Sequence, residues 1–299
     1  MTARLIDGKK IAEEIKEELK TQIEQLNKIH SLVPGLATVL VGDDPASHVY
    51  VNLKIKNCQA LGIASFNHQL SAETSQKELL DLVHNLNADP AVHGILVQVP
   101  LPKHIDETEV LLSIDPKKDV DGFHPFSLGK MVIGEDTFLS CTPAGIQQLL
   151  IRSNIETQGK HVVVVGRSNI VGKPIANILM QKNPHANATV TICHSRTPNI
   201  KDYTLQADIL IVAIGIPGFI TADMVKEGVT VIDVGTNKIG TTSTGKARLT
   251  GDVAFEEVSE IAGAITPSPG GVGPMTIAML MSNTVKAAKL SIGLKPQDP

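Results

Sequence analysis

Tyr50 and Lys54 lie four residues apart in a segment that is expected to form a helix, so they share one face of it. Asp44 is a suitable N-cap, and Pro45 suits the first helical turn, where its missing N–H costs nothing. Gly62 is a suitable residue for the end of this helix. Taken alone, the pair also fits a packed tyrosine beside a solvated lysine.

Two later segments add polar groups that can act with this pair. Gln98 interrupts the apolar run of residues 94–102, which is expected to form a strand. Asp119 and Asp121 stand in the polar loop of residues 116–125. Gln98 also fits an ordinary hydrogen-bonded group at a strand end, so its position alone does not decide its role.

Together these segments resemble the bifunctional methylenetetrahydrofolate dehydrogenase/cyclohydrolase family. The family's lysine-bearing helix matches residues 47–56, its strand matches residues 94–102, and its aspartate loop matches residues 116–125. The match extends from residues 6–8 to residues 269–274, which is nearly the full chain. Several long motifs in order are far more specific than a single glycine pattern.

The resemblance implies that 5,10-methylenetetrahydrofolate is oxidised to the methenyl cation, which is then hydrolysed to 10-formyltetrahydrofolate. The folate nitrogen lone pair drives hydride loss, so that step needs mainly alignment. Hydrolysis needs a proton acceptor for water and a proton donor for the leaving nitrogen, and Lys54 is the candidate for both. Burial and the adjacent cation would lower the lysine pKa from about 10.4, which favours the neutral amine.

The resemblance assigns the other catalytic candidates to folate binding. Gln98 can orient the amine of Lys54 without raising its pKa as a carboxylate would. Asp121 can accept two adjacent N–H donors of the pterin edge, and Tyr50 can lay its ring on the p-aminobenzoyl group. Asp119 is the alternative anchor, although the family pattern selects Asp121 and a bracing role in its own loop fits Asp119 better.

Further substrate-binding positions follow from the same resemblance. These are Val99, Pro100, Pro269, Gly270 and Gly271. Glycines in residues 269–273 allow close backbone approach to a ligand, and a strained connector is the alternative reading. His48 and His124 match no catalytic position of the family, so both are assigned structural roles.

A cofactor loop follows the apolar run of residues 162–165. It departs from G-x-G-x-x-G, because Ser168 and Val171 occupy the second and third glycine positions after Gly166. It still offers a helix N-terminus with free N–H groups for a phosphate, and Arg167 adds charge. The resemblance gives the cofactor role to Gly166, Arg167, Ser168 and Ser195.

The segment of residues 193–197 bears on the choice of dinucleotide. It lacks the acidic residue that usually binds the ribose 2′-hydroxyl of NAD. Ser195 and Arg196 can instead hold a 2′-phosphate, although a solvated arginine is a fair competitor. The resemblance favours NADP and implies a contact from Thr236, where the family usually has isoleucine.

Composition narrows the class of protein. The chain has 299 residues, 42% of them hydrophobic and 19% charged, which suits two globular domains. A net charge of −4 and 3% aromatic residues argue against nucleic acid as a partner. The three cysteines are scattered, which predicts a cytoplasmic protein without a metal site. The sequence shows no apolar signal segment and no membrane-spanning segment, so no membrane partner is expected.

Alternating strand and helix patterns predict an α/β fold with two α/β domains, the second a Rossmann-like doubly wound parallel sheet. We predict a folate-binding catalytic domain at residues 1–142, completed by a C-terminal helix at residues 275–299. Residues 143–274 are predicted to form the NADP-binding domain. The resemblance further implies a homodimer that acts in one-carbon metabolism and purine biosynthesis.

Two other functions fit parts of the sequence. One is a two-domain dehydrogenase of the shikimate-dehydrogenase type, against which the set Tyr50, Lys54, Gln98 and Asp121 argues. The other is a nucleotide-binding regulatory subunit that has lost catalysis, against which the intact Lys54 and Gln98 argue.

Overall fold

The computed structural model describes residues 2–241 and 247–296. Their chain forms two compact units. Unit 1 lies within Met1–Glu13, Met131–Gly134 and Thr142–Thr276, and unit 2 lies within Glu14–Lys130, Glu135–Cys141 and Ile277–Pro299. Residue 1 of the predicted first domain and residues 297–299 of its predicted C-terminal helix lie outside the described residues.

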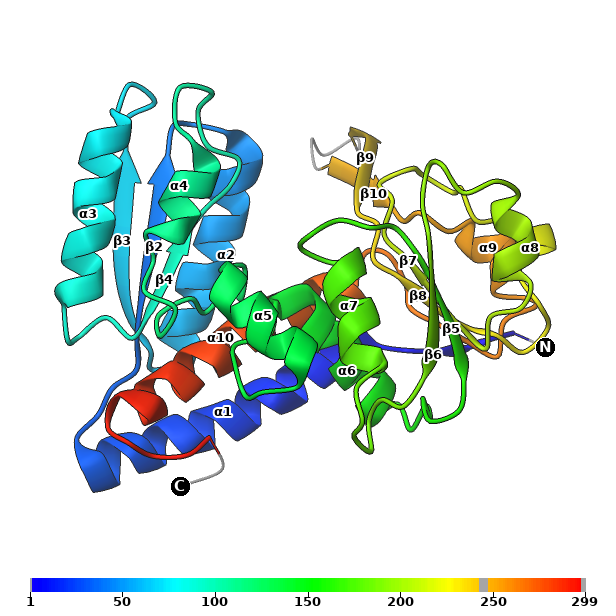
Figure 1. Ribbon diagram of the computed structural model, residues 1–299, viewed down its shortest axis with the longest axis horizontal. Coiled ribbons are helices and arrows are strands. Elements are labelled where there is room, and N and C mark those ends of the chain that lie inside the picture. The colour runs from blue at the N-terminus through cyan, green and yellow to red at the C-terminus, as the bar shows by residue number, and fades with distance from the viewer. Residues whose placement is uncertain (1, 242–246, 297–299) are drawn as a thin grey trace. The chain divides into compact units, whose positions relative to one another are not determined.

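Unit 2 contains a parallel sheet whose described strands run in the order β3-β2-β4. Its elements are β2 (Gly35–Val41), α2 (Pro45–Leu61), β3 (Ala64–Leu70), α3 (Gln76–Ala88), β4 (Gly94–Val97) and α4 (Glu107–Leu112). Alternate residues of β2, such as Ala37 and Val39, pack in one buried cluster with Leu79 and Val83 of α3. Figure 1 shows α2 and α3 on opposite sides of this sheet.

Unit 1 contains a larger parallel sheet, with the described strands in the order β1-β11-β8-β7-β5-β6. Its strands are β1 (Arg4–Leu5), β5 (His161–Val165), β6 (Thr189–Cys193), β7 (Ile209–Val212), β8 (Thr230–Asp233) and β11 (Ala264–Ile265). Helices α7 (Gly172–Leu179), α8 (Ile200–Thr204) and α9 (Phe255–Val258) surround it, with the short helix η1 (Ala222–Met224). An antiparallel pair, β9 (Asn237–Thr241) and β10 (Ala247–Thr250), completes the described strands.

The strand order of unit 1 places β5 between β6 and β7. The chain passes from β5 to β6 on one side and then crosses to β7 on the other, which makes a topological switch point at the carboxyl end of β5. Figure 1 shows α7 on one face of the sheet and α8 and α9 on the other. The expected doubly wound, Rossmann-like sheet is therefore confirmed.

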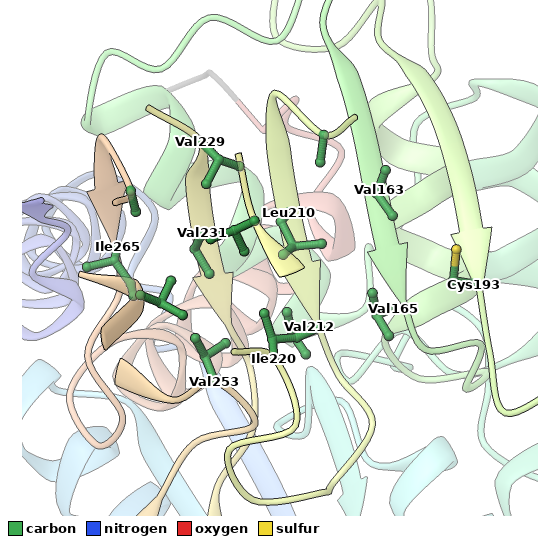
Figure 2. Packing of buried hydrophobic residues seen from close by; sticks show 14 residues of the cluster. Val163, Val165, Cys193, Leu210, Val212, Ile220, Val229, Val231, Val253 and Ile265 are labelled. Atoms are coloured by element: carbon green, nitrogen blue, oxygen red, sulfur yellow. The ribbon is translucent and has the colours of Figure 1, made fainter. Parts of the chain in front are cut away.

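One buried cluster holds a face of this sheet together. Val163, Leu210 and Val231 come from three neighbouring strands and pack against Ile220 and Val253 of the connecting segments. Figure 2 shows these side chains side by side across the sheet. Burial on both faces explains why β5, β7 and β8 are almost uninterrupted runs of valine, leucine and isoleucine.

Within the described residues, four helices run across the unit boundaries. They are α1 (Gly8–His30), α5 (Pro125–Ile133), α6 (Cys141–Arg152) and α10 (Val272–Ser291). The described residues 2–13, which include β1 and the start of α1, group with unit 1. The reason is that β1 pairs in parallel with β11 at the edge of the larger sheet.

We expect Leu210→Ala to lower the free energy of unfolding by about 2–5 kcal/mol, because the removed atoms leave a cavity in a core that stays closely packed. Leu210 has 0% of its surface exposed. Ile239→Ala is the control, since Ile239 is 47% exposed and its truncation should change stability by about 0.5 kcal/mol or less. Denaturant titration of both variants measures the difference, and equal values would contradict this account of the core.

Candidate active site

Helix α2 carries the amine at the centre of the candidate site in unit 2. The side chain of Asp44 accepts a hydrogen bond from the backbone N–H of Ser47, which caps the helix as predicted. At the other end Gly62 adopts a left-handed conformation with φ of 78°, which glycine adopts without strain. These caps fix the helix that carries both Tyr50 and Lys54.

Lys54 Nζ donates a hydrogen bond to Gln98 Oε1 at 2.9 Å. Gln98 follows directly after β4, and its Nε2 donates to the backbone oxygen of Val99 at 2.7 Å. This second bond turns the amide oxygen toward the lysine. The structure therefore joins two predicted site residues that are 44 positions apart in the chain.

Electrostatics at Lys54 favour the neutral amine. Burial is the main effect and lowers the pKa of Lys54, while the nearby Asp121 and Cys141 act in the opposite direction. Burial also raises the pKa of Asp121, and the positive charge of Lys54 opposes that rise. Lys54 and Asp121 both keep part of their surface exposed, but the surrounding protein desolvates their charged ends.

Cys141 also borders this site, although no catalytic or binding role was predicted for it. Its Sγ donates to the backbone oxygen of Val120 at 3.3 Å, and its pKa is raised well above the ordinary value, first by burial and then by Asp121. The thiol therefore stays protonated beside Asp121. No sequence motif indicated this, because only the folded chain brings the start of α6 to the loop of Asp121.

Asp119 faces its own loop. It is buried, and its carboxylate accepts hydrogen bonds from the backbone N–H groups of Phe123 and His124 and from the hydroxyl of Ser127. This is the bracing role expected from the sequence. It leaves Asp121 as the carboxylate whose charge acts on Lys54.

The other residues predicted around the amine differ in exposure. Tyr50 is 49% exposed, and Val99 is partly buried beside the exposed Pro100. His124 accepts a hydrogen bond at Nδ1 from the backbone N–H of Phe126, and His48 lies 3.7 Å from Asp43.

The predicted cofactor residues lie in unit 1, at the carboxyl ends of its strands. Gly166 follows β5, Ser195 and Arg196 follow β6, and Thr236 follows β8. Gly166 has φ of 135°, and a Cβ atom there would lie 2.3 Å from the backbone oxygen of Ala213. Only glycine allows this close approach of the loop to the neighbouring strand end.

Ser168 has a local role that the sequence analysis did not assign. Its hydroxyl oxygen accepts hydrogen bonds from the backbone N–H groups of Val171 and Gly172, at 3.1 and 3.3 Å, where α7 begins. Arg167, Ser195, Arg196 and Thr236 are exposed at this edge of the sheet. The first three carry the donors predicted for phosphate binding.

The segment of residues 266–271 belongs to unit 1 as well. Ser268 donates its hydroxyl hydrogen to the backbone oxygen of Gly235 at 2.6 Å, and the backbone N–H of Lys9 donates to the oxygen of Gly270. Pro269, Gly270 and Gly271 therefore lie in a different unit from Lys54.

Residues 6–121 match the family described as tetrahydrofolate dehydrogenase/cyclohydrolase, catalytic domain, and residues 140–292 match its NAD(P)-binding domain. The chain belongs to this family. The bifunctional protein FolD of Dehalococcoides mccartyi is 61% identical over 98% of this chain and 99% of its own length.

Solved structures of family relatives have the same fold. FolD of Campylobacter jejuni is 49% identical, covers 96% of this chain and 99% of its own, and superposes with a TM-score of 0.91. The Trypanosoma brucei enzyme, complexed with NADP cofactor and inhibitor, is 39% identical, covers 98% and 99% of the two chains, and superposes with a TM-score of 0.92. The predicted family and the α/β fold class are confirmed.

The shikimate-type alternative is matched only by distantly similar structures. A shikimate 5-dehydrogenase of Thermus thermophilus is 16% identical and superposes with a TM-score of 0.50, which is a likeness of fold alone.

In the part of the chain that the structure describes, no group of histidine, cysteine or acidic residues is placed to hold a metal ion. Among the same residues no helix is long and apolar enough to cross a membrane.

We expect Asp121→Asn to lower the pKa of Lys54 further, because the charge of Asp121 raises that pKa against the effect of burial. The pH dependence of amine acylation at Lys54, followed by peptide mass spectrometry, measures this shift. Asp81→Asn is the matched control, since Asp81 is exposed and pairs with Lys77 instead. An unchanged or raised pKa in Asp121→Asn would contradict the assigned coupling.

Proposed function

We propose that this family member catalyses both the NADP-dependent oxidation of 5,10-methylenetetrahydrofolate and the hydrolysis of the resulting methenyl cation to 10-formyltetrahydrofolate. The observation that carries the proposal is the buried amine of Lys54 held by a neutral amide, with Asp121 beside it. The two family domains and the double activity named for its relatives support the same conclusion.

Lys54 serves the hydrolysis step as base and then as acid. Its lowered pKa favours a neutral amine, which retains a lone pair while one N–H donates to Gln98. As water attacks the methenyl carbon, its proton passes to this lone pair. The ammonium so formed donates this proton to the leaving folate nitrogen as its bond to the carbinol carbon breaks. The carbinol hydroxyl releases its remaining proton to solvent, which forms the C=O of the 10-formyl product.

Gln98 and Asp121 position the reacting groups. An amide oxygen orients the amine without the full negative charge that would hold the lysine protonated. The carboxylate of Asp121 accepts two pterin N–H donors, and the exposed ring of Tyr50 stacks on the p-aminobenzoyl group. The remaining folate contacts we propose are with Val99, Pro100, Pro269, Gly270 and Gly271.

The residues at the carboxyl edge of unit 1 suit a dinucleotide phosphate. Gly166 permits close backbone approach, Arg167 adds a positive charge, and no carboxylate follows β6 in residues 194–197. The free N–H groups expected at the start of α7 are not available, because those of residues 171–173 already donate to Ser168. When bound, NADP⁺ supplies the hydride acceptor. The residues proposed to hold it are Gly166, Arg167, Ser168, Ser195, Arg196 and Thr236.

Several finer assignments rest on family resemblance. We propose that residues 1–142 with 275–299 bind folate and that residues 143–274 bind NADP. We further propose a homodimer that functions in the cytoplasm and supplies one-carbon units for purine biosynthesis.

The decisive experiment follows methenyl absorbance with purified protein, 5,10-methylenetetrahydrofolate and either dinucleotide. Formation and subsequent decay of the methenyl signal are expected with NADP⁺. A protein that binds NADP⁺ without any turnover would instead be a regulatory subunit.

We expect Lys54→Met to reduce cyclohydrolase turnover by about 100-fold or more and the dehydrogenase step by less, because only hydrolysis requires proton transfer. Stopped-flow absorbance separates the two steps. Lys56→Met on the same helix is the control, since Lys56 is exposed and should tolerate the change. Equal losses in both steps would mean that Lys54 acts by positioning alone.

We expect Ser195→Asp to erode the preference for NADP⁺ over NAD⁺ roughly 10- to 100-fold, the scale of one charge-assisted contact. The introduced carboxylate repels the 2′-phosphate and removes a donor. Ser195→Ala removes the hydroxyl donor without adding a charge, so comparing the two variants separates charge repulsion from loss of the hydrogen bond. The ratio of kcat/KM for the two dinucleotides is the measurement, and a ratio indifferent to both substitutions would show that this loop does not read the phosphate.

A further inference from the structure

Two carboxylates are buried at the cofactor edge of unit 1, and the proposed mechanism uses neither of them. Asp233 is the last residue of β8 and is 3% exposed, and Asp252 follows closely after β10 and is 0% exposed. Ionisable side chains are almost never buried so completely unless their hydrogen bonds are satisfied. The contacts of this pair therefore indicate what it holds in place.

Asp252 joins the segments that follow β7 and β8. Its Oδ2 accepts hydrogen bonds from the backbone N–H groups of Ile214 and Gly215, at 2.8 and 2.9 Å. Its Oδ1 accepts one from Nδ2 of Asn237 at 2.8 Å. The carboxylate of Asp252 thus links the backbone that follows β7 to Asn237, the first residue of β9.

Asp233 fixes the other side of the same arrangement. Its Oδ1 accepts hydrogen bonds from the backbone N–H groups of Gly235 and Asp252, each at 2.9 Å, and its Oδ2 accepts one from Val253 at 3.1 Å. The two side chains are therefore linked, because Asp233 holds the backbone that presents Asp252. The donors in these contacts are all backbone or amide N–H groups.

Two glycines make this close packing sterically possible. A Cβ atom on Gly251 would lie 1.7 Å from Oδ2 of Asp233, and one on Gly235 would lie 2.3 Å from Oδ1 of Asp252. Real Cβ atoms do not approach other atoms so closely, so only glycine fits at either position. The pair and its glycines form one interdependent unit.

We propose that Asp233 and Asp252 are positioning residues for the dinucleotide, which hold residues 214–215 and 235–237 in the conformation that binds it. The inference rests on the proposed NADP site, because ligands of such sheets bind outside the carboxyl ends of the strands. Loops ordered before binding lose less conformational entropy when the ligand arrives. The two carboxylates keep these loops ordered in the free protein.

The ionisation of Asp233 supports a role other than stability. Burial raises the pKa of Asp233 to about 6, the charge of Asp252 raises it too, and its backbone hydrogen bonds act in the opposite direction. Because the folded-state pKa lies above the unfolded value, the contribution of Asp233 to stability is greatest at low pH and is lost as pH rises through about 6. At neutral pH the buried charge of Asp233 therefore lowers the stability of the folded protein.

The test is Asp252→Asn, which replaces an acceptor of the Ile214 and Gly215 N–H groups by a mixed donor and acceptor. We expect the KM for NADP⁺ in the dehydrogenase reaction to rise about tenfold and the calorimetric affinity for NADP⁺ to fall equally. Hydrolysis of added methenyltetrahydrofolate should stay near the wild-type rate, because Lys54, Gln98 and Asp121 lie in unit 2.

Two further variants complete the experiment. Asp223→Asn is the matched control, since Asp223 lies in the same unit, is exposed and pairs with Lys201 at 2.6 Å. Asn237→Ala removes a single donor to Asp252 and should raise the KM for NADP⁺ less than Asp252→Asn does. It provides the readout if circular dichroism shows that Asp252→Asn does not fold.

The outcomes separate this inference from the proposed function. An unchanged NADP⁺ affinity in a folded variant, or equal loss of both activities, would overturn the positioning role while the wild-type enzyme remains active. Absence of methenyl formation by the wild type with either dinucleotide would overturn the proposed function. A selective rise in KM for NADP⁺ supports the inference.

Discussion

A single hydrogen bond, from the amine of Lys54 to the amide oxygen of Gln98, holds together the candidate site of unit 2. A carboxylate in place of the amide would hold the lysine charged, whereas an amide oxygen orients it and leaves burial to lower its pKa. The position of this pair depends on the caps of α2, on the end of β4 and on the hydrogen bond from Gln98 to Val99. The loop of Asp121 completes the arrangement and limits how far the lysine pKa falls.

Buried carboxylates have different roles in the two units. Asp119 accepts hydrogen bonds from its own loop and from Ser127 at the start of α5, and so shapes the segment that presents Asp121. Asp233 and Asp252 satisfy theirs across segments that are distant in sequence. In each case backbone N–H dipoles stabilise the charge, which gives directional contacts that an apolar side chain cannot provide.

The parallel sheets explain why the functional residues lie where they do. Strands β4, β5 and β7 are buried along almost all of their length, so polar groups there are confined to the strand ends and to the loops that follow. Gln98 follows β4 directly, and Gly166, Ser195 and Thr236 follow β5, β6 and β8. The switch point beside β5 then leaves room for a ligand between loops that turn to opposite faces of the sheet.

Local sequence patterns determined much of this protein. The cap at Asp44 predicted the start of α2, and the apolar strands predicted the Rossmann-like sheet. The motifs around Lys54, Gln98 and Asp121 predicted the family. Each of these patterns depends on residues close together in the chain. Tertiary structure decided what depends on distant segments. Three such features join segments far apart in sequence: the pairing of β1 with β11, the approach of Cys141 to Asp121, and the contacts of Asp252. No local periodicity encodes them.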